Sequence, residues 1–310
     1  MYSYILRRLL QAIPVIIGST TIVFILVFLA PGDVVETMMG QRAGTEMKLQ
    51  LRHELGLDQP KYIQYLSYMG GLAKGDLGRS WISGRKVSES IMITFPYTVQ
   101  LAVAAILITI LIGISVGLIS SIWRGSFWDH ASRILALFFI SNPIFVFALL
   151  LIIIFAVELS WLPPSGVGEG FGSIWYLILP AIALGSRSAA FIARVTRASM
   201  LEVLGKIYIT TAYAKGLKKS VVILKHALKN ALIPVITILG LNFGDLLTGA
   251  IITEFVFGRP GLGKLAIDSI STRDLPVLMG VIVFVTIVFI LANLAVDILY
   301  SFIDPRIRYD

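Results

Sequence analysis

The stretch ILALFFISNPIFVFALLLIIIFAV, residues 134–157, contains no charged side chain. A helix needs about 20 apolar residues to cross a hydrocarbon core about 30 Å thick, so this stretch is long enough to span a membrane. Residues 9–32 form a second run without charge. Hydrophobic residues make up 57% of the 310 positions and charged residues 14%, which is too little polar material to cover a water-soluble surface. The sequence therefore predicts an integral membrane protein.

Six segments meet the length and hydropathy needed for a transmembrane helix, and we expect an all-α membrane protein. The predicted spans cover residues 9–29, 98–122, 134–157, 174–194, 232–252 and 277–302. Pro143 and Pro180 should kink the third and fourth spans, since proline removes a backbone donor. Gly113 and Gly117 stand four residues apart and should let another helix approach the second span closely.

The placement of lysine and arginine predicts the orientation. Nine of the 26 cationic residues lie in the segment 187–230, whereas the short segment 158–173 has none. Cytoplasmic loops carry an excess of Lys and Arg, so we expect both termini in the cytoplasm. The net charge of +8 thus reports topology and gives no reason to expect a nucleic-acid partner. The outer segment 31–97 mixes eight cations with seven anions, and Glu46–Leu55 should be one of its helices.

The sequence contains no pattern typical of an enzyme or of a metal site. It has no cysteine, and His53, His130 and His226 fall in three separate loops without ligand spacing. The string GRPGLGK, residues 258–264, has the spacing of a phosphate-binding loop, but Leu265 stands where a Ser or Thr would bind magnesium. We expect a glycine-rich turn there, no cofactor in this chain, and no ATP hydrolysis by it.

Polar residues at membrane depth are candidates for a substrate pathway, because burying them in lipid is costly. The candidates are Asn142, Asn242 and Asp245. Asp245 could line a pathway, hydrogen-bond to a neighbouring helix, or serve packing alone. An intramembrane aspartyl protease using Asp245 and Asp297 is disfavoured, since Asn242 occupies the position of a glycine in that motif.

The basic inner loop, residues 206–230, is longer than a simple connection requires. Gly216 should divide it into two helices, of which the second presents an apolar face. The residues predicted on that face are Val221, Leu224, Leu228 and Leu232. Small residues before Gly216 favour a surface for close approach by another protein. A helix lying on anionic headgroups would explain the lysines equally well, but not the small residues or the glycine.

The string YITTAYAKGL, residues 208–217, followed by KHALKNALIP, residues 225–234, resembles the EAA loop of ABC-importer permeases in its peptide-permease form. Thr210 replaces the glutamate of the general motif and Lys229 its proline. Other strings resemble the B-type subunit of dipeptide, oligopeptide and nickel importers. They are Tyr4–Leu9, Pro31–Asp33, Leu55–Pro60, Gly75–Ser80, Glu254–Phe257, Pro260–Gly263, Arg273–Pro276 and Asp304–Arg308.

This resemblance implies a MetI-like type I permease core, formed by spans two to six, with the first span and the outer subdomain added. The implied divisions are residues 1–30, an N-terminal transmembrane helix; 31–97, an extracytoplasmic subdomain; 98–303, the permease domain; and 304–310, a cytoplasmic tail. It implies the plasma (inner) membrane of a bacterial-type cell. The implied partners are a paralogous C-type permease, two ATPases that hold ATP and magnesium, and an extracytoplasmic binding protein.

The resemblance also implies site residues. Those expected to couple to the ATPase are Thr210, Thr211, Ala212, Ala214, Lys215, Gly216 and Leu217, and those of an outer gate turn are Pro260, Gly261 and Gly263. Peptides are the expected substrates, and related importers carry nickel chelates, glutathione or haem. A secondary transporter is the alternative outside this family, but it would need inverted repeats, which the sequence does not show.

Overall fold

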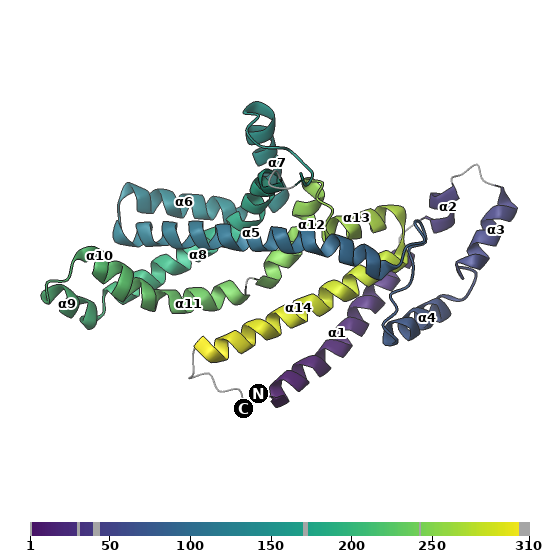
Figure 1. Cartoon of the computed structure of the whole chain (residues 1–310), viewed down its shortest axis with the longest axis horizontal. Helices are drawn as coiled ribbons and strands as arrows, with labels where there is room; N and C mark the ends of the chain where they lie inside the picture. The colour runs from purple at the N-terminus through teal and green to yellow at the C-terminus, as the bar shows by residue number, and fades with distance from the viewer. Residues whose placement is uncertain (1, 30–31, 40–43, 170–172, 242, 304–310) are drawn as a thin grey trace. The chain divides into compact units, whose positions relative to one another are not determined.

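A computed structural model describes residues 2–29, 32–39, 44–169, 173–241 and 243–303. Within these ranges the chain is helical and forms no β-strand, apart from one isolated bridge between Arg79 and Lys86 (Figure 1). The helices are α1 (Tyr2–Leu29), α2 (Val34–Met39), α3 (Thr45–Glu54), α4 (Lys61–Ala73), α5 (Val87–Ile122), α6 (Phe127–Ser141), α7 (Ile144–Leu151), α8 (Trp175–Leu204), α9 (Ile207–Ala214), α10 (Lys219–Val221), α11 (Leu228–Leu241), α12 (Phe243–Val256), α13 (Leu262–Thr272) and α14 (Leu275–Ile303). Two π-helical segments, η1 (Ile152–Glu158) and η3 (Val222–Ala227), follow α7 and α10.

The described helices confirm an all-α membrane fold. Five stretches are long and apolar enough to cross a membrane, and the bent pair formed by α6 and α7–η1 makes a sixth if it counts as one span. The five are Leu10–Leu29, Val87–Ile122, Trp175–Leu204, Lys219–Gly240 and Leu275–Val296. The first, second, fourth and sixth predicted spans lie on α1, α5, α8 and α14.

The third predicted span bends far more sharply than an ordinary proline kink. The axes of α6 and of α7–η1 differ by 111°. Asn142 is extended, with φ −84° and ψ 137°, because the following Pro143 disfavours helical geometry at the residue before it. The Asn142 side chain donates to the carbonyl of Phe138 at 2.9 Å and so satisfies an acceptor at the end of α6. By contrast, α8 runs without a break through Pro180.

The predicted fifth span, residues 232–252, includes position 242, which lies outside the described residues, so its C-terminal limit stays a prediction. On the N-terminal side the structure differs from the prediction. The apolar stretch able to cross a membrane runs from Lys219 to Gly240 and so begins before the predicted start at 232. The loop residues from 219 onward thus continue directly into a membrane helix.

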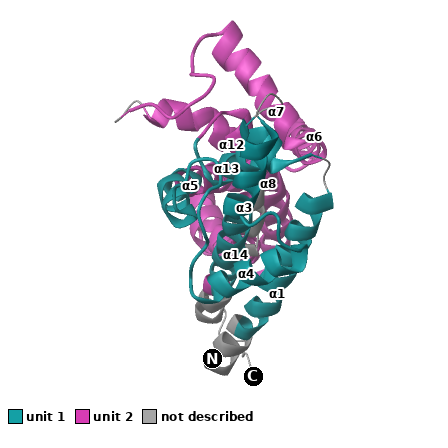
Figure 2. Ribbon diagram, turned by 90° about the vertical axis from the view of Figure 1, so that its right-hand side faces the viewer, with its two compact units in different colours: residues 1–98, 260–294, 309–310 teal, residues 99–259, 295–308 magenta. Residues whose placement is uncertain are grey.

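The described residues form two compact units, coloured separately in Figure 2. Unit 1 comprises residues 1–98 and 260–294. Its apolar core joins the first turns of α5 to α13 and α14, and its outer segment contains α2, α3 and α4. Helix α3 confirms the helix predicted at 46–55. At Gly280 the backbone lies so near Val87 that an added Cβ would come within 2.4 Å of Val87 Cγ1.

Unit 2 comprises residues 99–259 and 295–308. Helices α5 and α8 pack closely in it, as the two predicted glycines suggested. A Cβ at Gly113 would come within 2.8 Å of Ile192, and one at Gly117 within 2.6 Å of the Ala193 carbonyl. The approach is mutual, since a Cβ at Gly185 of α8 would lie 2.7 Å from the Ala105 carbonyl. The α5–α8 contact therefore depends on glycine at three positions.

Candidate functional site

Helix α9 has eight residues, and two of them are buried against the rest of unit 2. It follows the extended residue Lys206 and ends before Gly216, whose φ of +75° is a left-handed conformation that glycine adopts without strain. Ile209 and Ala212, three positions apart, are 1% and 8% exposed. Their spacing places both side chains on one face of the helix. The remaining residues of α9 are exposed, so the helix lies on the surface of unit 2.

The two buried residues of α9 belong to a hydrophobic cluster that reaches the membrane helices. Its other buried members are Met200, Val203, Val222, Ile223, Ala227 and Ala231, which come from α8, η3 and α11. Leu118 and Ile122 at the end of α5 pack against the cluster. A force on α9 would therefore act on α5, α8 and α11 through direct apolar contact.

The buried face of the second loop helix differs from the predicted one. Val222, Ala227 and Ala231 are fully buried, whereas Val221 and Leu224 are exposed. The segment Val222–Ala227 is π-helical, and its wider turns shift the phase that an α-helical spacing assumes. The prediction was correct in assigning two helices separated by Gly216 and in placing Leu228 on the packed face, but wrong for Val221 and Leu224. Small side chains at positions 227 and 231 permit the close contact with α8.

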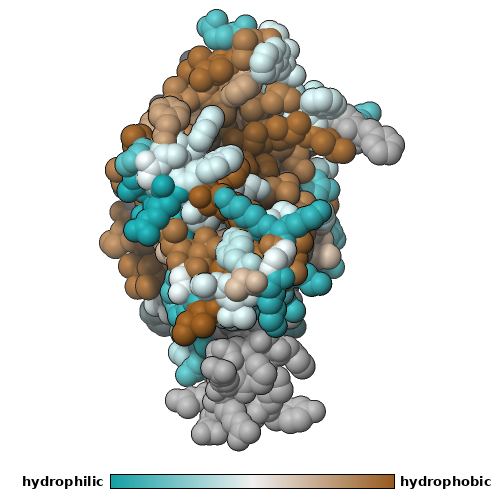
Figure 3. All heavy atoms as spheres, turned by 90° about the vertical axis from the view of Figure 1, so that its left-hand side faces the viewer, coloured by the Kyte–Doolittle hydropathy of each residue, from teal (hydrophilic) through white to brown (hydrophobic). Residues whose placement is uncertain are grey.

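An exposed surface of mixed apolar and cationic character surrounds α9. Ile207 is 85% exposed, and Tyr208, Tyr213 and Leu217 are exposed as well. Lysines at positions 206, 215, 218 and 219 are also exposed. Figure 3 looks onto the end of the molecule that carries α9 and α10, and shows hydrophilic side chains among apolar ones. The Asn230 amide donates to the Tyr208 hydroxyl at 2.9 Å, which ties α9 to α11.

Of the predicted coupling residues, most lie on this surface. Thr210, Thr211, Ala214, Lys215, Gly216 and Leu217 are exposed. Ala212 instead lies in the hydrophobic cluster, where it anchors the helix. The Thr211 hydroxyl donates to the Ile207 carbonyl at 3.1 Å, a bond within the helix itself.

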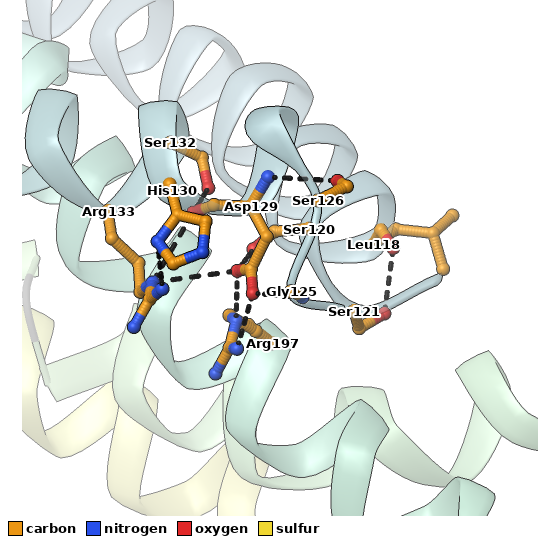
Figure 4. A network of polar contacts seen from close by, with 10 residues as sticks. All are labelled: Leu118, Ser120, Ser121, Gly125, Ser126, Asp129, His130, Ser132, Arg133 and Arg197. Atoms are coloured by element: carbon orange, nitrogen blue, oxygen red, sulfur yellow. Dashed lines mark hydrogen bonds and ion pairs between the residues drawn. The ribbon is translucent and has the colours of Figure 1, made fainter. Parts of the chain in front are cut away.

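A buried carboxylate fixes the turn between α5 and α6 to α8 (Figure 4). Asp129 is 1% exposed and receives two hydrogen bonds from Arg197, from Nε at 2.7 Å and from Nη2 at 2.9 Å. The Ser120 hydroxyl donates to it at 2.6 Å and the Gly125 amide at 2.9 Å. Such charge-assisted bonds are about twice as strong as neutral ones. The carboxylate thus joins α5, α6 and α8, of which α5 and α8 also contribute residues to the cluster under α9.

Sequence reasoning missed this network, because it treated Arg197 only as one of the cations of the loop. A local signal was present. Ser126 precedes α6 and Asp129 follows three residues later, which is the spacing of a helix N-cap with an acid in the first turn. In the structure the Asp129 amide donates to the Ser126 hydroxyl oxygen at 3.4 Å. The partner on α8, 68 positions away, could not be read from that signal.

The structure describes one of the three polar pathway candidates in full. Asn142 is half-buried at the bend between α6 and α7. Asn242 lies outside the described residues. Asp245 belongs to α12, but its side chain is outside the described set as well. Their role in a pathway stays a prediction from the sequence.

The predicted outer turn leads into α13. Gly261 is the residue before the helix, and Gly263 lies in its first turn; both are buried, and Pro260 is half-buried. The Leu262 amide, which a phosphate-binding loop would offer to an anion, donates instead to the Thr98 hydroxyl at 2.9 Å in a buried position. This contact supports the glycine-rich turn predicted there.

Comparison with known families now decides the class of the chain. Residues 109–309 match the family described as binding-protein-dependent transport system inner membrane component. Residues 1–102 match the N-terminal model of the same transport-system membrane components. The chain belongs to this family. Members of the family are inner-membrane subunits, which agrees with the apolar helices described above.

Curated relatives of this family align with the whole chain. The dipeptide transport system permease protein DppB of Alkalihalophilus pseudofirmus is 43% identical over 333 residues and covers 100% of both chains. The di/tripeptide permease DppB of Pseudomonas aeruginosa is 44% identical over 334 residues, covering 100% of this chain and 99% of its own. The glutathione transport system permease protein GsiC of Escherichia coli is 42% identical over 310 residues, with 100% of both covered.

Solved structures share the fold of this family member. A chain of the inward-facing MetNI methionine ABC transporter has a TM-score of 0.56 at 19% identity, covering 69% of this chain and 96% of its own. A chain of an amino acid ABC transporter crystallised with histidines has a TM-score of 0.52 at 17% identity, covering 71% and 95%. These likenesses confirm the MetI-like architecture predicted from the sequence.

Proposed function

We propose that this chain is one of two membrane subunits of an ATP-driven importer, and that it carries short peptides delivered by an extracytoplasmic binding protein. Its membrane partner would be a paralogous C-type subunit. Two ATPase subunits would hold ATP and magnesium and would dock on the cytoplasmic loop 206–230. The proposal places both termini in the cytoplasm, following the excess of cations in that loop.

The observation that carries the proposal is the group of exposed apolar side chains on and just after α9: Ile207, which is 85% exposed, Tyr208, Tyr213 and Leu217. Exposed apolar side chains grouped among polar ones mark an interaction surface. An apolar side chain at this place suits a protein partner, and the surrounding lysines favour an acidic one. The alternative, a helix resting on headgroups, explains the lysines but not the left-handed Gly216 that ends α9.

The cluster beneath α9 suggests how movement of an ATPase would reach the membrane. Ile209 and Ala212 contact residues of α8 and η3, and η3 continues into α11. The Asp129–Arg197 ion pair holds the α5–α6 turn to α8. An ATPase that displaced α9 would therefore act on α5, α8 and α11, because residues of all three helices pack in or against the cluster under α9.

Two substitutions on α9 test the docking surface. Ile207→Asp should leave the thermal stability of the purified complex unchanged, since the side chain is exposed, and should reduce substrate-stimulated ATP hydrolysis and peptide uptake in proteoliposomes at least tenfold. Ile209→Ala should instead lower the melting temperature, because it opens a cavity under the helix and costs about 2–4 kcal/mol. Normal uptake by the Ile207→Asp variant would refute docking through α9.

The relatives support a peptide substrate and also favour a second candidate, glutathione, which is itself a tripeptide. The alignment with GsiC runs over 310 residues, the length of this chain, whereas those with the two DppB proteins run over 333 and 334. The DppB proteins therefore carry segments without a counterpart here. Uptake of radiolabelled dipeptide, tripeptide and glutathione by the reconstituted importer would rank the two, and uptake of none would overturn both.

The proposed topology can be tested with single cysteines, since the chain has none of its own. Cysteine at Asp58 or Arg79, both exposed in unit 1, should react with an impermeant maleimide added outside intact spheroplasts. Cysteine at Ser220, exposed at the start of α10, should react only after the membrane is opened. The reverse pattern would place the termini outside and exclude the ATPase docking proposed for the loop.

A further inference from the structure

Helices α5, α6 and α8 enclose an apolar groove in unit 2. Its volume is about 410 Å³, and the side chains that line it include Ile112, Leu135 and Phe139, with the small Ala189 and Ala190 forming part of the α8 wall. The groove lies along helices that cross or enter the membrane. An apolar hollow at this depth suits a hydrocarbon chain, which gains dispersion contacts without hydrogen bonds.

Arginines lie beside the groove. A hollow of about 10 Å³, too small to enclose a phosphate, is lined by Arg133, Arg194 and Arg197. It adjoins the groove, because four residues line both: Val116, Ser132, Ala136 and Ala193. The Arg133 and Arg194 side chains are exposed, so their guanidinium groups can meet a headgroup at the surface next to the apolar groove.

The charges beside the groove do not balance. Asp129 is engaged by both Arg197 donors, and the Arg133 Nε atom lies 3.7 Å from the same carboxylate. Among the described residues no carboxylate pairs with Arg194, which is exposed. Two guanidinium groups therefore share one carboxylate, and Arg194 adds a third cation, so the surplus is positive. Exposed Trp128 also lines the groove, and tryptophan favours the interface between hydrocarbon and headgroups.

We propose that this groove binds an anionic phospholipid, with one acyl chain between α5, α6 and α8 and the phosphate against Arg133 and Arg194. Basic pockets between transmembrane helices are known to hold acidic headgroups. A zwitterionic lipid offers the same chain but brings its own cation, so it would not satisfy the surplus charge. The lipid would fill the hollow behind the Asp129 network and keep α6 seated against α8.

Fluorescence quenching by brominated lipids tests the proposal, because bromine quenches tryptophan only on contact. The 310-residue chain, purified together with its bound subunits, is reconstituted in phosphatidylcholine vesicles. One series of vesicles contains increasing amounts of phosphatidylglycerol brominated on the acyl chain, and a second series contains phosphatidylcholine brominated in the same way. The fluorescence of Trp128 is obtained by subtracting the signal of the Trp128→Phe variant from that of the wild type. The subtraction cancels the fluorescence of the four other tryptophans of the chain and of those in any partner. Brominated phosphatidylglycerol should half-quench this signal at a several-fold lower mole fraction than brominated phosphatidylcholine.

Arginine variants locate the headgroup. Arg194→Gln and Arg133→Gln should each reduce the preference for phosphatidylglycerol about fivefold, the factor that one cation near an anionic lipid contributes. Arg124 is an exposed arginine in the turn after α5 and lines neither the groove nor the small hollow, so Arg124→Gln should leave this preference unchanged. Because Arg194 makes no ion pair that supports the described fold, its variant should fold even if the Arg133 variant does not.

Three results would overturn the proposal. Equal quenching by the two lipids would mean ordinary contact with the bilayer, without a headgroup site. An absence of quenching at Trp128 by either lipid would mean that a protein segment covers the groove. A preference that survives Arg194→Gln and Arg133→Gln would place the anionic headgroup elsewhere.

Discussion

Asp129 of unit 2 and Asp274 of unit 1 are both buried carboxylates, 1% and 4% exposed, and they are held in different ways. Asp129 pairs with the guanidinium of Arg197, which donates to both of its oxygens. Asp274 accepts from the Ser80 hydroxyl at 2.5 Å and from the Trp81 amide at 3.1 Å, both neutral donors. The first is a charge-compensated joint between membrane helices, and the second is a hydrogen-bonded clasp between distant segments.

The two sites also differ in how far they reach along the chain. Asp129 bonds to residues 9 and 68 positions away, and its helix cap is local. The Asp274 bonds join residues 193 and 194 positions apart, so they tie the outer segment to the turn between α13 and α14. The comparison indicates that an ion pair holds the α5–α6 turn of unit 2 to α8, whereas backbone and hydroxyl donors hold the outer segment of unit 1 in place.

The largest effect should come from removing the charged joint. Asp129→Ala leaves Arg197, whose side chain is 22% exposed, without its carboxylate, and breaking a buried pair in this way costs about 3–5 kcal/mol. Equilibrium unfolding in mixed micelles should show this loss. Glu202→Ala on the same helix α8 removes only an exposed pair with Lys206 and should cost at most about 0.5 kcal/mol. Equal losses in the two variants would show that the Asp129 pair adds nothing beyond a surface contact.

A smaller effect is expected at the neutral clasp. Asp274→Ala leaves the Ser80 hydroxyl and the Trp81 amide without their acceptor, at a cost of about 1–3 kcal/mol. Hydrogen exchange of the Trp81 amide should accelerate at least tenfold in this variant. The Gly78 amide, which bonds to Asp76 nearby, serves as the control and should be unchanged. Unchanged exchange at Trp81 would mean that other contacts hold the outer segment.

The smallest effect on stability is expected for the exposed pair formed by His53 and Asp58. The hydrogen bond between His53 and Asp58, 2.8 Å long, raises the pKa of His53 above its ordinary 6.5 and lowers the pKa of Asp58 below its ordinary 3.8. The contribution of His53 is complete below pH 6.5 and disappears as the pH rises through its raised pKa. That of Asp58 is complete above pH 3.8 and disappears as the pH falls through its lowered pKa.

The pair is therefore strongest between about pH 4 and pH 6.5. Nitrogen NMR of labelled histidine should give a higher midpoint for His53 in the wild type than in Asp58→Asn. The stability of the two proteins should agree within error, because both groups are solvated. Identical midpoints would contradict the pairing.

Local chemistry accounts for what sequence reasoning predicted correctly. The limits of α3, the break at Gly216 and the bend at Pro143 each follow from one or a few residues whose backbone preferences hold in most surroundings. Gly113 and Gly117 likewise predicted a close helix contact, because glycine lacks a Cβ and so lets the backbone of another membrane helix approach. The family resemblance, carried by several ordered motifs, agreed with the family that matches most of the chain.

Predictions failed where the outcome depended on which helix lies opposite. The apolar face of the second loop helix was placed on Val221 and Leu224, but the close approach of α8 selected Val222 and Ala227 through a π-helical turn. The fifth span was predicted to begin at 232, but the apolar helical stretch begins at Lys219, because the second loop helix continues into α11. Arg197 was counted only as one of the cations of the loop, because its partner Asp129 is distant in sequence and meets it only in the folded chain.

The sequence by itself determined that the chain is a helical membrane protein, roughly where it crosses the bilayer, and where the loop 206–230 turns. These properties depend on the length of apolar runs and on single-residue φ and ψ preferences, which act over a few positions. Only the tertiary structure decided that Asp129 meets Arg197, that Asp274 meets Ser80, and that three arginines line a small hollow next to the apolar groove. Those pairings join residues tens to hundreds of positions apart. They stabilise the protein only after packing has excluded water, because hydrogen bonds and ion pairs are stronger in the interior of low dielectric constant.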